Sequence, residues 1–137
     1  ILRSGNVYGY NPSYRIDAVV NRFLFQANFT GRITINGSGD QHRSFIHVDK
    51  LASATTAAVD GQVANGMYNV VEHNLTINEV AAAVKEIYPG LDIIHANYNL
   101  RMKDMITALP CRIWEQIALP QASFAGELQE FKTHFSF

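Results

Sequence analysis

The chain has 137 residues, of which 47% are hydrophobic and 17% are charged, and its formal net charge is −1. This composition is typical of one globular, soluble domain with a hydrophobic core, and it excludes a disordered chain. The near-neutral charge, without a long basic run, argues against a nucleic-acid binder, and no apolar run is long enough to span a membrane.

The amino-terminal part is predicted to form a strand, a loop and a helix. Residues 1–3 are typical of the end of a buried strand, and because the first residue is not methionine, we expect further sequence upstream. Residues 4–12 are rich in Gly and Asn and predict a loop. A loop that follows a strand of an open α/β sheet often carries a ligand site, and a plain connecting loop is the alternative.

A helix is predicted from residue 13 or 14 to residue 28, with Ser13 as its N-cap. Its apolar residues recur at helical spacing on one face, namely Ile16, Val19, Val20, Phe23, Leu24 and Ala27. Phe25 and Phe29 fall nearly opposite that face. They indicate a second surface to bury, against a further part of the protein or another subunit, and a partly exposed pair is the alternative.

The stretch from Gly37 to Asp49 is the most informative part of the chain. It follows a strand predicted at residues 32–36. A Gly-rich turn there precedes Arg43, and the apolar Phe45 and Ile46 come next. Because a fixed guanidinium binds phosphate or carboxylate oxygens in pairs, and Gly lets the backbone approach a ligand, we interpret this stretch as an anion site. A surface turn with a solvated Arg is the alternative.

The rest of the chain alternates helices and strands. Asp49 is predicted to cap a helix that ends at Gly61, and residues 66–71 and 91–96 predict strands. Thr76 and Glu79 form a capping box for a helix that stops before residue 89. Residues 111–117 predict a short helix, and Ser123 caps the last one, whose apolar stripe is Phe124, Leu128, Phe131 and Phe135. This alternation predicts a single α/β domain over residues 1–137.

The histidines and the single cysteine give no indication of a metal or thiol site. His47 and Asp49 are two residues apart with no third ligand nearby, so we expect no metal and a structural role for His47. Cys111 is predicted at a helix start without an identifiable partner base, which favours a buried small residue. One cysteine excludes an internal disulfide, and no signal-peptide pattern is present, so we expect a cytoplasmic protein.

Four motifs in this order resemble the carboxyl-terminal part of the extended short-chain dehydrogenase/reductases. They are Ile-Leu-Arg-Ser-Gly-Asn-Val-Tyr-Gly, Gly-Ser-Gly-Asp-Gln-His-Arg-Ser-Phe-Ile-His-Val-Asp, Gly-Met-Tyr-Asn-Val and Thr-Ile-Asn-Glu. That family comprises the NAD-dependent nucleotide-sugar epimerases and dehydratases. The resemblance implies an α/β substrate-binding subdomain, a small mixed sheet with helices, in which residues 1–12 are the last strand and loop of a Rossmann part that is missing here.

The resemblance also implies roles for residues that would contact the cofactor and the diphosphate. Ser4 and Gly5 would lie beside the nicotinamide of NAD or NADP, which the missing amino-terminal part would mainly bind. Asn6 would hydrogen-bond the substrate near its diphosphate. Arg43 would clamp the diphosphate, in agreement with the anion site inferred above, and Arg101 would be a second clamp.

Further roles implied by the resemblance concern the nucleotide. The strand formed by Ile33, Thr34, Ile35 and Asn36 would run along the nucleotide base. Asp104 would accept a hydrogen bond from the ribose or stand close to it. A carboxylate suits a pair of hydroxyl groups, which agrees with this role.

The sequence departs from the family pattern in two ways. Lys50 replaces the second of two acidic residues that usually follow the His-Val pair. No Tyr is followed four residues later by Lys, and no Gly-x-Gly-x-x-Gly or Gly-x-x-Gly-x-x-Gly occurs. The catalytic pair and the nucleotide fingerprint of the family would therefore both lie upstream of this chain.

The favoured function is the nucleotide-sugar binding part of an NAD(P)-dependent sugar-nucleotide epimerase or dehydratase, an isomerase or a lyase. We expect a UDP-, dTDP- or GDP-linked sugar as partner, no nucleic acid, no membrane and a homodimer of the longer protein. The 137-residue chain alone is expected to be inactive. The alternatives are a non-catalytic relative on the same fold, either RNA-binding or redox-sensing, and a structural fragment with an incomplete site.

Overall fold

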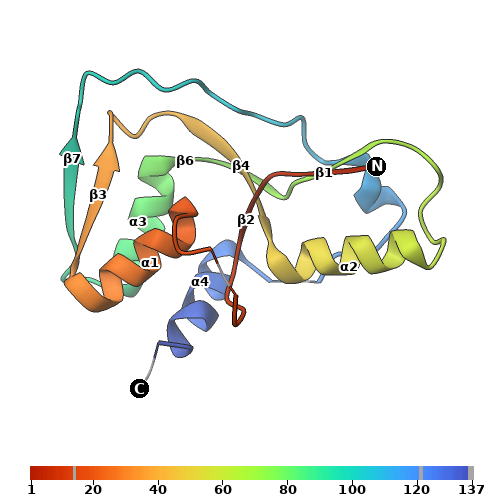
Figure 1. Cartoon of the computed structure of the whole chain (residues 1–137), viewed down its shortest axis with the longest axis horizontal. Helices are drawn as coiled ribbons and strands as arrows, with labels where there is room; N and C mark the ends of the chain where they lie inside the picture. The colour runs from red at the N-terminus through yellow and green to blue at the C-terminus, as the bar shows by residue number, and fades with distance from the viewer. Residues whose placement is uncertain (14, 121, 136–137) are drawn as a thin grey trace.

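The computed structural model describes residues 1–13, 15–120 and 122–135. The elements follow the chain in the order β1 (Leu2–Ser4), β2 (Asn6–Tyr8), α1 (Val19–Thr30), β3 (Arg32–Asn36), β4 (His42–His47), α2 (Val48–Val59), β5 (Tyr68–Val70), β6 (His73–Thr76), α3 (Ile77–Ile87), β7 (Asp92–Ala96), the 3-10 helix η1 (Arg112–Glu115) and α4 (Phe124–Thr133). The predicted mixture of helices and short strands is confirmed (Figure 1).

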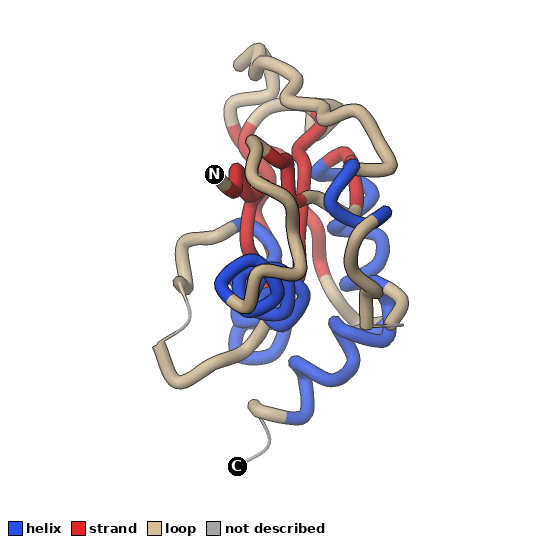
Figure 2. The backbone as a smooth tube through the Cα atoms, turned by 90° about the vertical axis from the view of Figure 1, so that its right-hand side faces the viewer, coloured by secondary structure: helices blue, strands red, loops and turns tan. Residues whose placement is uncertain are grey.

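The strands pair in small sheets. In the central sheet, β4 pairs in parallel with β2 and in antiparallel with β6, so this sheet is mixed. Two parallel pairs, β1 with β5 and β3 with β7, lie apart from it. In Figures 1 and 2 the loop segment 97–110, here called the strap, passes over the strands on the side opposite to α1 and α4.

Two hydrophobic cores lie to either side of the central sheet. The first joins α1, α3 and α4 to β3, through buried residues that include Phe23, Leu24, Ile33, Val80, Val84, Leu128 and Phe131. The second packs α2 against β5 and η1 and includes Ile46, Ala54, Val70 and Ile113. The indole nitrogen of Trp114 donates a hydrogen bond to the carbonyl of Val71 at 2.9 Å and so ties η1 to this core.

Helix α1 begins later than the spacing of its apolar residues predicts. It starts at Val19, after Ala18, whose side chain forms no capping bond, so the prediction of Ser13 as N-cap is wrong. The side chain of Asn11 instead accepts a hydrogen bond from the Ser13 amide at 2.8 Å. Such a local turn competes with the helix, and Arg15 then follows in a second turn. Tyr14 lies outside the described residues.

Two strands were not predicted. Residues 4–12 were expected to form a loop, but Asn6, Val7 and Tyr8 pair with Phe45, Ile46 and His47 of β4. Strand β6 likewise pairs with β4 in antiparallel register. Asn and Gly disfavour strands locally, so these pairings depend on the tertiary structure rather than on propensity.

Of the four predicted helix caps, two are confirmed, and the cap of α2, like that of α1, is a different residue. Thr76 and Glu79 form the predicted capping box of α3, and Ser123 accepts a hydrogen bond from Gly126 as the N-cap of α4. Helix α2 is capped by His47 rather than by Asp49, because the His47 ring accepts a hydrogen bond from the Asp49 amide. Asp49 instead lies in the first turn, where its negative charge interacts favourably with the positive end of the helix dipole.

The aromatic pair Phe25 and Phe29 packs partly within the chain. Their ring centroids are 4.6 Å apart, and the ring of Phe135 lies 5.6 Å from that of Phe29 and 6.1 Å from that of Phe25. Phe29 keeps 47% of its surface exposed. Within the part of the chain that the structure describes, no helix combines the length and apolar composition needed to cross a membrane.

Candidate functional site

A cavity of about 570 Å³ opens between the β1–β2 segment, the start of α1 and strand β4. We call it the arginine cavity, because three guanidinium groups line it. Its lining is Ser4, Gly5, Asn6, Val7, Arg15, Asp17, Ala18, Val19, Arg22, Asn36, Gln41, Arg43, Ile77 and Met102. The structure thus brings five of the predicted site residues to one cavity, namely Ser4, Gly5, Asn6, Asn36 and Arg43.

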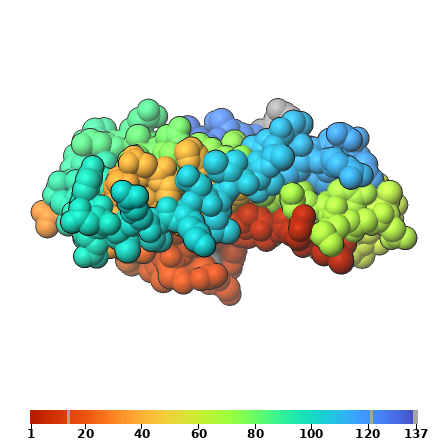
Figure 3. Space-filling view, turned by 90° about the horizontal axis from the view of Figure 1, so that it is seen from above, coloured from red at the N-terminus to blue at the C-terminus, as the bar shows by residue number. Residues whose placement is uncertain are grey.

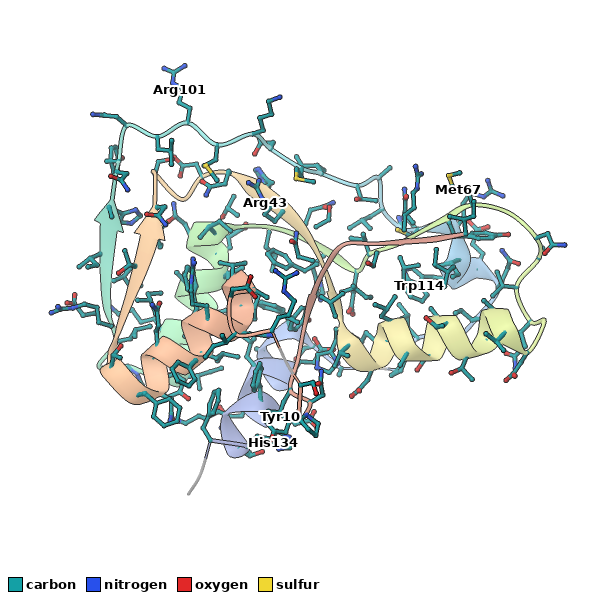
Figure 4. The ribbon with its side chains drawn as sticks, in the orientation of Figure 1. Tyr10, Arg43, Met67, Arg101, Trp114 and His134 are labelled. Atoms are coloured by element: carbon teal, nitrogen blue, oxygen red, sulfur yellow. The ribbon has the colours of Figure 1, made fainter. Side chains whose placement is uncertain are left out.

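Arg43 is held in place from two sides. Its neighbours Phe45 and Ile46 in β4 are buried, which anchors the backbone of the strand. Its Nη1 atom donates to the carbonyl of His42 at 2.7 Å and to the carbonyl of Lys103 in the strap. Figure 4 shows Arg43 between β4 and the strap. Carbonyl groups orient the guanidinium, and among the described residues it forms no ion pair within 4 Å, although its charge contributes to the lowered pKa of the Asp104 carboxyl.

Ser4, Gly5 and Asn6 form the opposite wall of this cavity. The Asn6 side-chain nitrogen donates to the Ser44 carbonyl at 3.1 Å. A Cβ atom at Gly5 would lie 2.7 Å from the Ser44 carbonyl oxygen, so only glycine lets β1 and β2 approach β4 this closely. The same three residues also line a cavity of about 450 Å³ that includes Thr107.

The predicted site strand β3 contributes one residue to the arginine cavity. Ile33 and Ile35 are 0% and 1% exposed and pack in the first core. Thr34 is partly buried on the other face of the strand, and Asn36 at its end lines the cavity. The side chains of the two isoleucines are therefore part of the core rather than of the cavity lining.

Arg101 and Asp104 line a second cavity of about 570 Å³ under the strap, which we call the outer cavity. Asp104 accepts a hydrogen bond from the His42 amide at 2.7 Å, and this bond holds the pKa of its carboxyl below the ordinary value. Arg101 points away from the ribbon in Figure 4. The outer cavity shares Gln41 and Met102 with the arginine cavity, so the two adjoin. Figure 3 shows the strap, coloured cyan to blue, along this face.

Three charged residues of the arginine cavity were missed from the sequence. Arg15 and Asp17 form a bidentate ion pair, with Nε–Oδ1 at 3.0 Å and Nη2–Oδ2 at 2.7 Å. This pair raises the pKa of Arg15 and lowers that of Asp17. Arg22 lies in the first turn of α1, and its buried Nε atom has no hydrogen-bond partner within the described ranges. The sequence did carry one signal for Arg22, because this residue is a charged side chain inside the apolar run Val19–Leu24.

A largely buried ionic cluster lies at the end of β2. Lys50 binds the carboxylates of Glu72 and Glu127, and Tyr8 donates to Glu127. Glu72, His73 and Glu127 also place ligand atoms within 4.8 Å of one another, in an arrangement that would suit a metal ion. The Lys50 ammonium already binds two of these three side chains, so we interpret the cluster as structural.

A family model described as "NAD dependent epimerase/dehydratase family" matches residues 1–71. Among curated proteins, the putative GDP-L-fucose synthase 2 of Arabidopsis thaliana is 32% identical over 96 residues, which cover 60% of this chain and 27% of that protein. The match therefore spans well under half of the curated relative.

Solved structures share the fold. The UDP-N-acetylglucosamine 4-epimerase of Methanobrevibacter ruminantium superposes with a TM-score of 0.79 at 23% identity, over 98% of this chain and 44% of that one. The UDP-glucose 4-epimerase of Thermotoga maritima superposes with a TM-score of 0.78 at 24% identity, over 98% of this chain and 44% of that one. The dTDP-glucose 4,6-dehydratase of Bacillus anthracis, solved with NAD, superposes with a TM-score of 0.76 at 20% identity, over 96% of this chain and 42% of that one. This chain thus spans less than half of each.

Proposed function

Because the chain belongs to the NAD dependent epimerase/dehydratase family, we propose that it is the substrate-binding part of a sugar-nucleotide epimerase or dehydratase. In this proposal the arginine cavity binds the diphosphate of a UDP-, dTDP- or GDP-linked sugar. Relatives on the same fold include enzymes named for UDP-glucose and dTDP-glucose, and the curated relative is named for GDP-L-fucose, which supports this class of ligand.

The observation that carries the proposal is the convergence of Arg43, Asn6 and Asn36 on one cavity, from three segments separated in the sequence. The guanidinium of Arg43 supplies charge and paired donors for phosphate oxygens. The two amide side chains supply donors and acceptors for the neighbouring hydroxyl and phosphate groups.

The nucleotide would extend from the arginine cavity into the outer cavity. The two cavities adjoin at Gln41 and Met102, so one elongated ligand can occupy both. There Asp104 would accept from the ribose, and Arg101 would lie beside the nucleotide. Asn36, at the end of β3, lines the arginine cavity and would contact the ligand there, on the side from which the nucleotide runs toward its base.

The residues present do not form a complete NAD site. The described helices begin after Ala18, His47, Thr76 and Ser123, none of which follows a Gly-rich phosphate loop of the dinucleotide-binding kind. We propose that NAD or NADP is bound mainly outside these residues, with Ser4 and Gly5 at its edge. Because no Tyr-x-x-x-Lys pair occurs either, the 137-residue chain would bind substrate without turning it over.

Calorimetry with UDP-glucose, dTDP-glucose and GDP-mannose tests the proposal. Arg43→Ala is expected to weaken binding of whichever sugar the chain binds by about 1.5–3 kcal/mol, the range for hydrogen bonds to charged groups. Arg32→Ala, at an exposed pair with Asp92 away from the cavity, is the matched control. Equal affinity of Arg43→Ala and the unmodified chain for every sugar would show that the ligand lies elsewhere. The homodimer of a longer protein and a cytoplasmic location stay predictions.

A further inference from the structure

The charges that line the arginine cavity do not balance. Arg15, Arg22 and Arg43 face one carboxylate, that of Asp17. Counting one unit for each group, three positive charges and one negative charge leave the lining at +2. A cavity with a net positive lining attracts anions, and the number of uncompensated charges sets which anion fits best.

Asp17 is committed to Arg15. The two side chains are joined through both guanidinium edges at 2.7 and 3.0 Å. This bidentate arrangement is the strongest geometry available to such a pair. Both side chains are largely exposed, so solvent screens the pair and ligands can reach it. Asp17 therefore forms its ion pair with Arg15 at the rim of the cavity, and the charge of Arg22 acts on the Asp17 carboxyl only from beyond ion-pair distance, since it contributes to the lowered pKa of that carboxyl.

Arg22 and Arg43 are the other two cations of the lining. Among the described residues, neither has a carboxylate within ion-pair distance. The Arg22 Nε atom is buried without a hydrogen-bond partner, while the side chain as a whole lines the cavity. Arg43 is oriented by carbonyl groups alone. Two guanidiniums from α1 and β4 thus face one space, whereas Arg101 lines the outer cavity.

We propose that Arg22 and Arg43 together bind the two negative charges of a nucleotide diphosphate linked to an uncharged sugar, and that Asp17 is the residue that disfavours acidic sugars. The inference rests on the proposed function and deepens it, since it names the substrate class. A uronic acid adds a third negative charge, and the cation available for it, Arg15, is already paired with Asp17. Removing the charge of Asp17 would leave Arg15 unpaired, and Arg15 could then bind the carboxylate of an acidic sugar.

Titration calorimetry on the 137-residue chain tests the inference with two pairs of ligands, UDP-glucose against UDP-glucuronate and GDP-mannose against GDP-mannuronate. The unmodified chain is expected to bind the neutral member of a pair more tightly. Arg22→Gln and Arg43→Gln should each weaken neutral-sugar binding about 10-fold, as the loss of one charged hydrogen bond does. Arg22→Lys, which keeps the charge, should recover part of that loss.

Asp17→Asn should improve binding of the acidic sugar by about 2- to 5-fold relative to the neutral one, the scale of an exposed pair, and added salt should reduce the gain. Asp92→Asn, which breaks the exposed pair with Arg32 outside the cavity, is the matched control and should leave the ratio unchanged. Thermal melting of each variant confirms that it is folded.

The outcomes separate the inference from the proposed function. If the chain binds none of the four nucleotide sugars, both are wrong. If neutral sugars bind through Arg43 but Arg22→Gln has no effect, the assignment of Arg22 is wrong. If Asp17→Asn leaves the ratio of acidic to neutral sugar unchanged, Asp17 does not select the substrate. In the last two cases the proposed function stands.

Discussion

The ammonium of Lys50 lies 2.7 Å from a carboxylate oxygen of Glu127, and the two side chains are only 1% and 2% exposed. Lys50 is in the first turn of α2 and Glu127 in the first turn of α4, so this pair joins two helices that are distant in the sequence. Glu72 is the second carboxylate on Lys50, and Tyr8 donates to the free oxygen of Glu127. One cation therefore holds β2, α2, α4 and the β5–β6 turn together.

Replacing Lys50 by methionine should destabilise the fold by about 3–5 kcal/mol, because the buried carboxylate of Glu127 and the partly buried carboxylate of Glu72 would lose their cation. Urea unfolding followed by circular dichroism measures this loss. Lys85→Met, at an exposed position of α3, is the control and should change the stability by less than about 0.5 kcal/mol. A loss below about 1 kcal/mol for Lys50→Met would show that the cluster does not depend on its cation.

Stability should fall at alkaline pH. Burial, together with the hydrogen bond to Glu127 and its charge, raises the pKa of Tyr8 far above its ordinary value of about 10. Burial lowers the pKa of Lys50, but its bonds to Glu127 and Glu72 outweigh this and raise it overall. A group whose folded pKa is raised stabilises the fold fully below its unfolded pKa, and that contribution is lost as the pH rises toward the folded pKa.

The melting temperature is therefore expected to decrease above about pH 10. Tyr8→Phe should make this decrease less steep, because the variant has no hydroxyl to titrate. Tyr98→Phe, at a tyrosine that is 66% exposed, should leave the slope as it is. Equal slopes for the unmodified chain and Tyr8→Phe would contradict the assignment of the alkaline transition to Tyr8.

Gly39 should be far less tolerant of substitution than Gly31, although both have positive φ angles, +82° and +63°. A Cβ atom at Gly39 would collide with the amide of Asn78, which bonds to Ser38 and Asp40, whereas nothing lies within 4 Å of a Cβ at Gly31. Gly31→Ala should cost about 1–2 kcal/mol from the backbone alone. Gly39→Ala should cost about 1–3 kcal/mol more from overpacking, measured by urea unfolding. Equal losses of stability in the Gly39 and Gly31 variants would mean that the turn at Gly39 relaxes to accommodate the added Cβ atom.

Removing the N-cap of α3 should cost about 0.5–2 kcal/mol. Thr76 accepts from the Glu79 amide at 3.1 Å, and the Glu79 carboxylate accepts from the Thr76 amide at 2.7 Å. Thr76→Ala removes the first bond, and chemical denaturation measures the effect. Thr56→Ala, in the exposed interior of α2, removes no cap and serves for comparison. A Thr76 variant as stable as the Thr56 variant would rule out a contribution from the cap.

The 137-residue chain is expected to turn over neither UDP-glucose nor dTDP-glucose in the presence of NAD. It contains neither the nucleotide fingerprint nor the Tyr/Lys pair that proton abstraction requires in this family. NADH absorbance and product chromatography are the measurements. Turnover that persists through repurification and disappears in Tyr8→Phe or Tyr10→Phe would place the catalytic machinery within this chain.

Local signals in the sequence determined part of this molecule. The capping box at Thr76 and Glu79, the apolar spacing of α3 and the alternation of β3 each act within a few residues, so they were predicted correctly. The apolar anchor after Arg43 is also local, and the burial of Phe45 and Ile46 followed the prediction. For the same reason, the motifs were sufficient to indicate the family that the family model matches.

Only the tertiary structure decided the remainder. Asn6 to Tyr8 become a strand because β4 offers its edge, and the fold brings Arg15, which precedes α1, and Arg22, in its first turn, to the same cavity. In the sequence, Lys50 is only a departure from a family motif. In the folded chain, its ammonium forms ion pairs with Glu72 and Glu127. Strand pairing and buried ion pairs depend on residues far apart in the chain, so no local pattern records them.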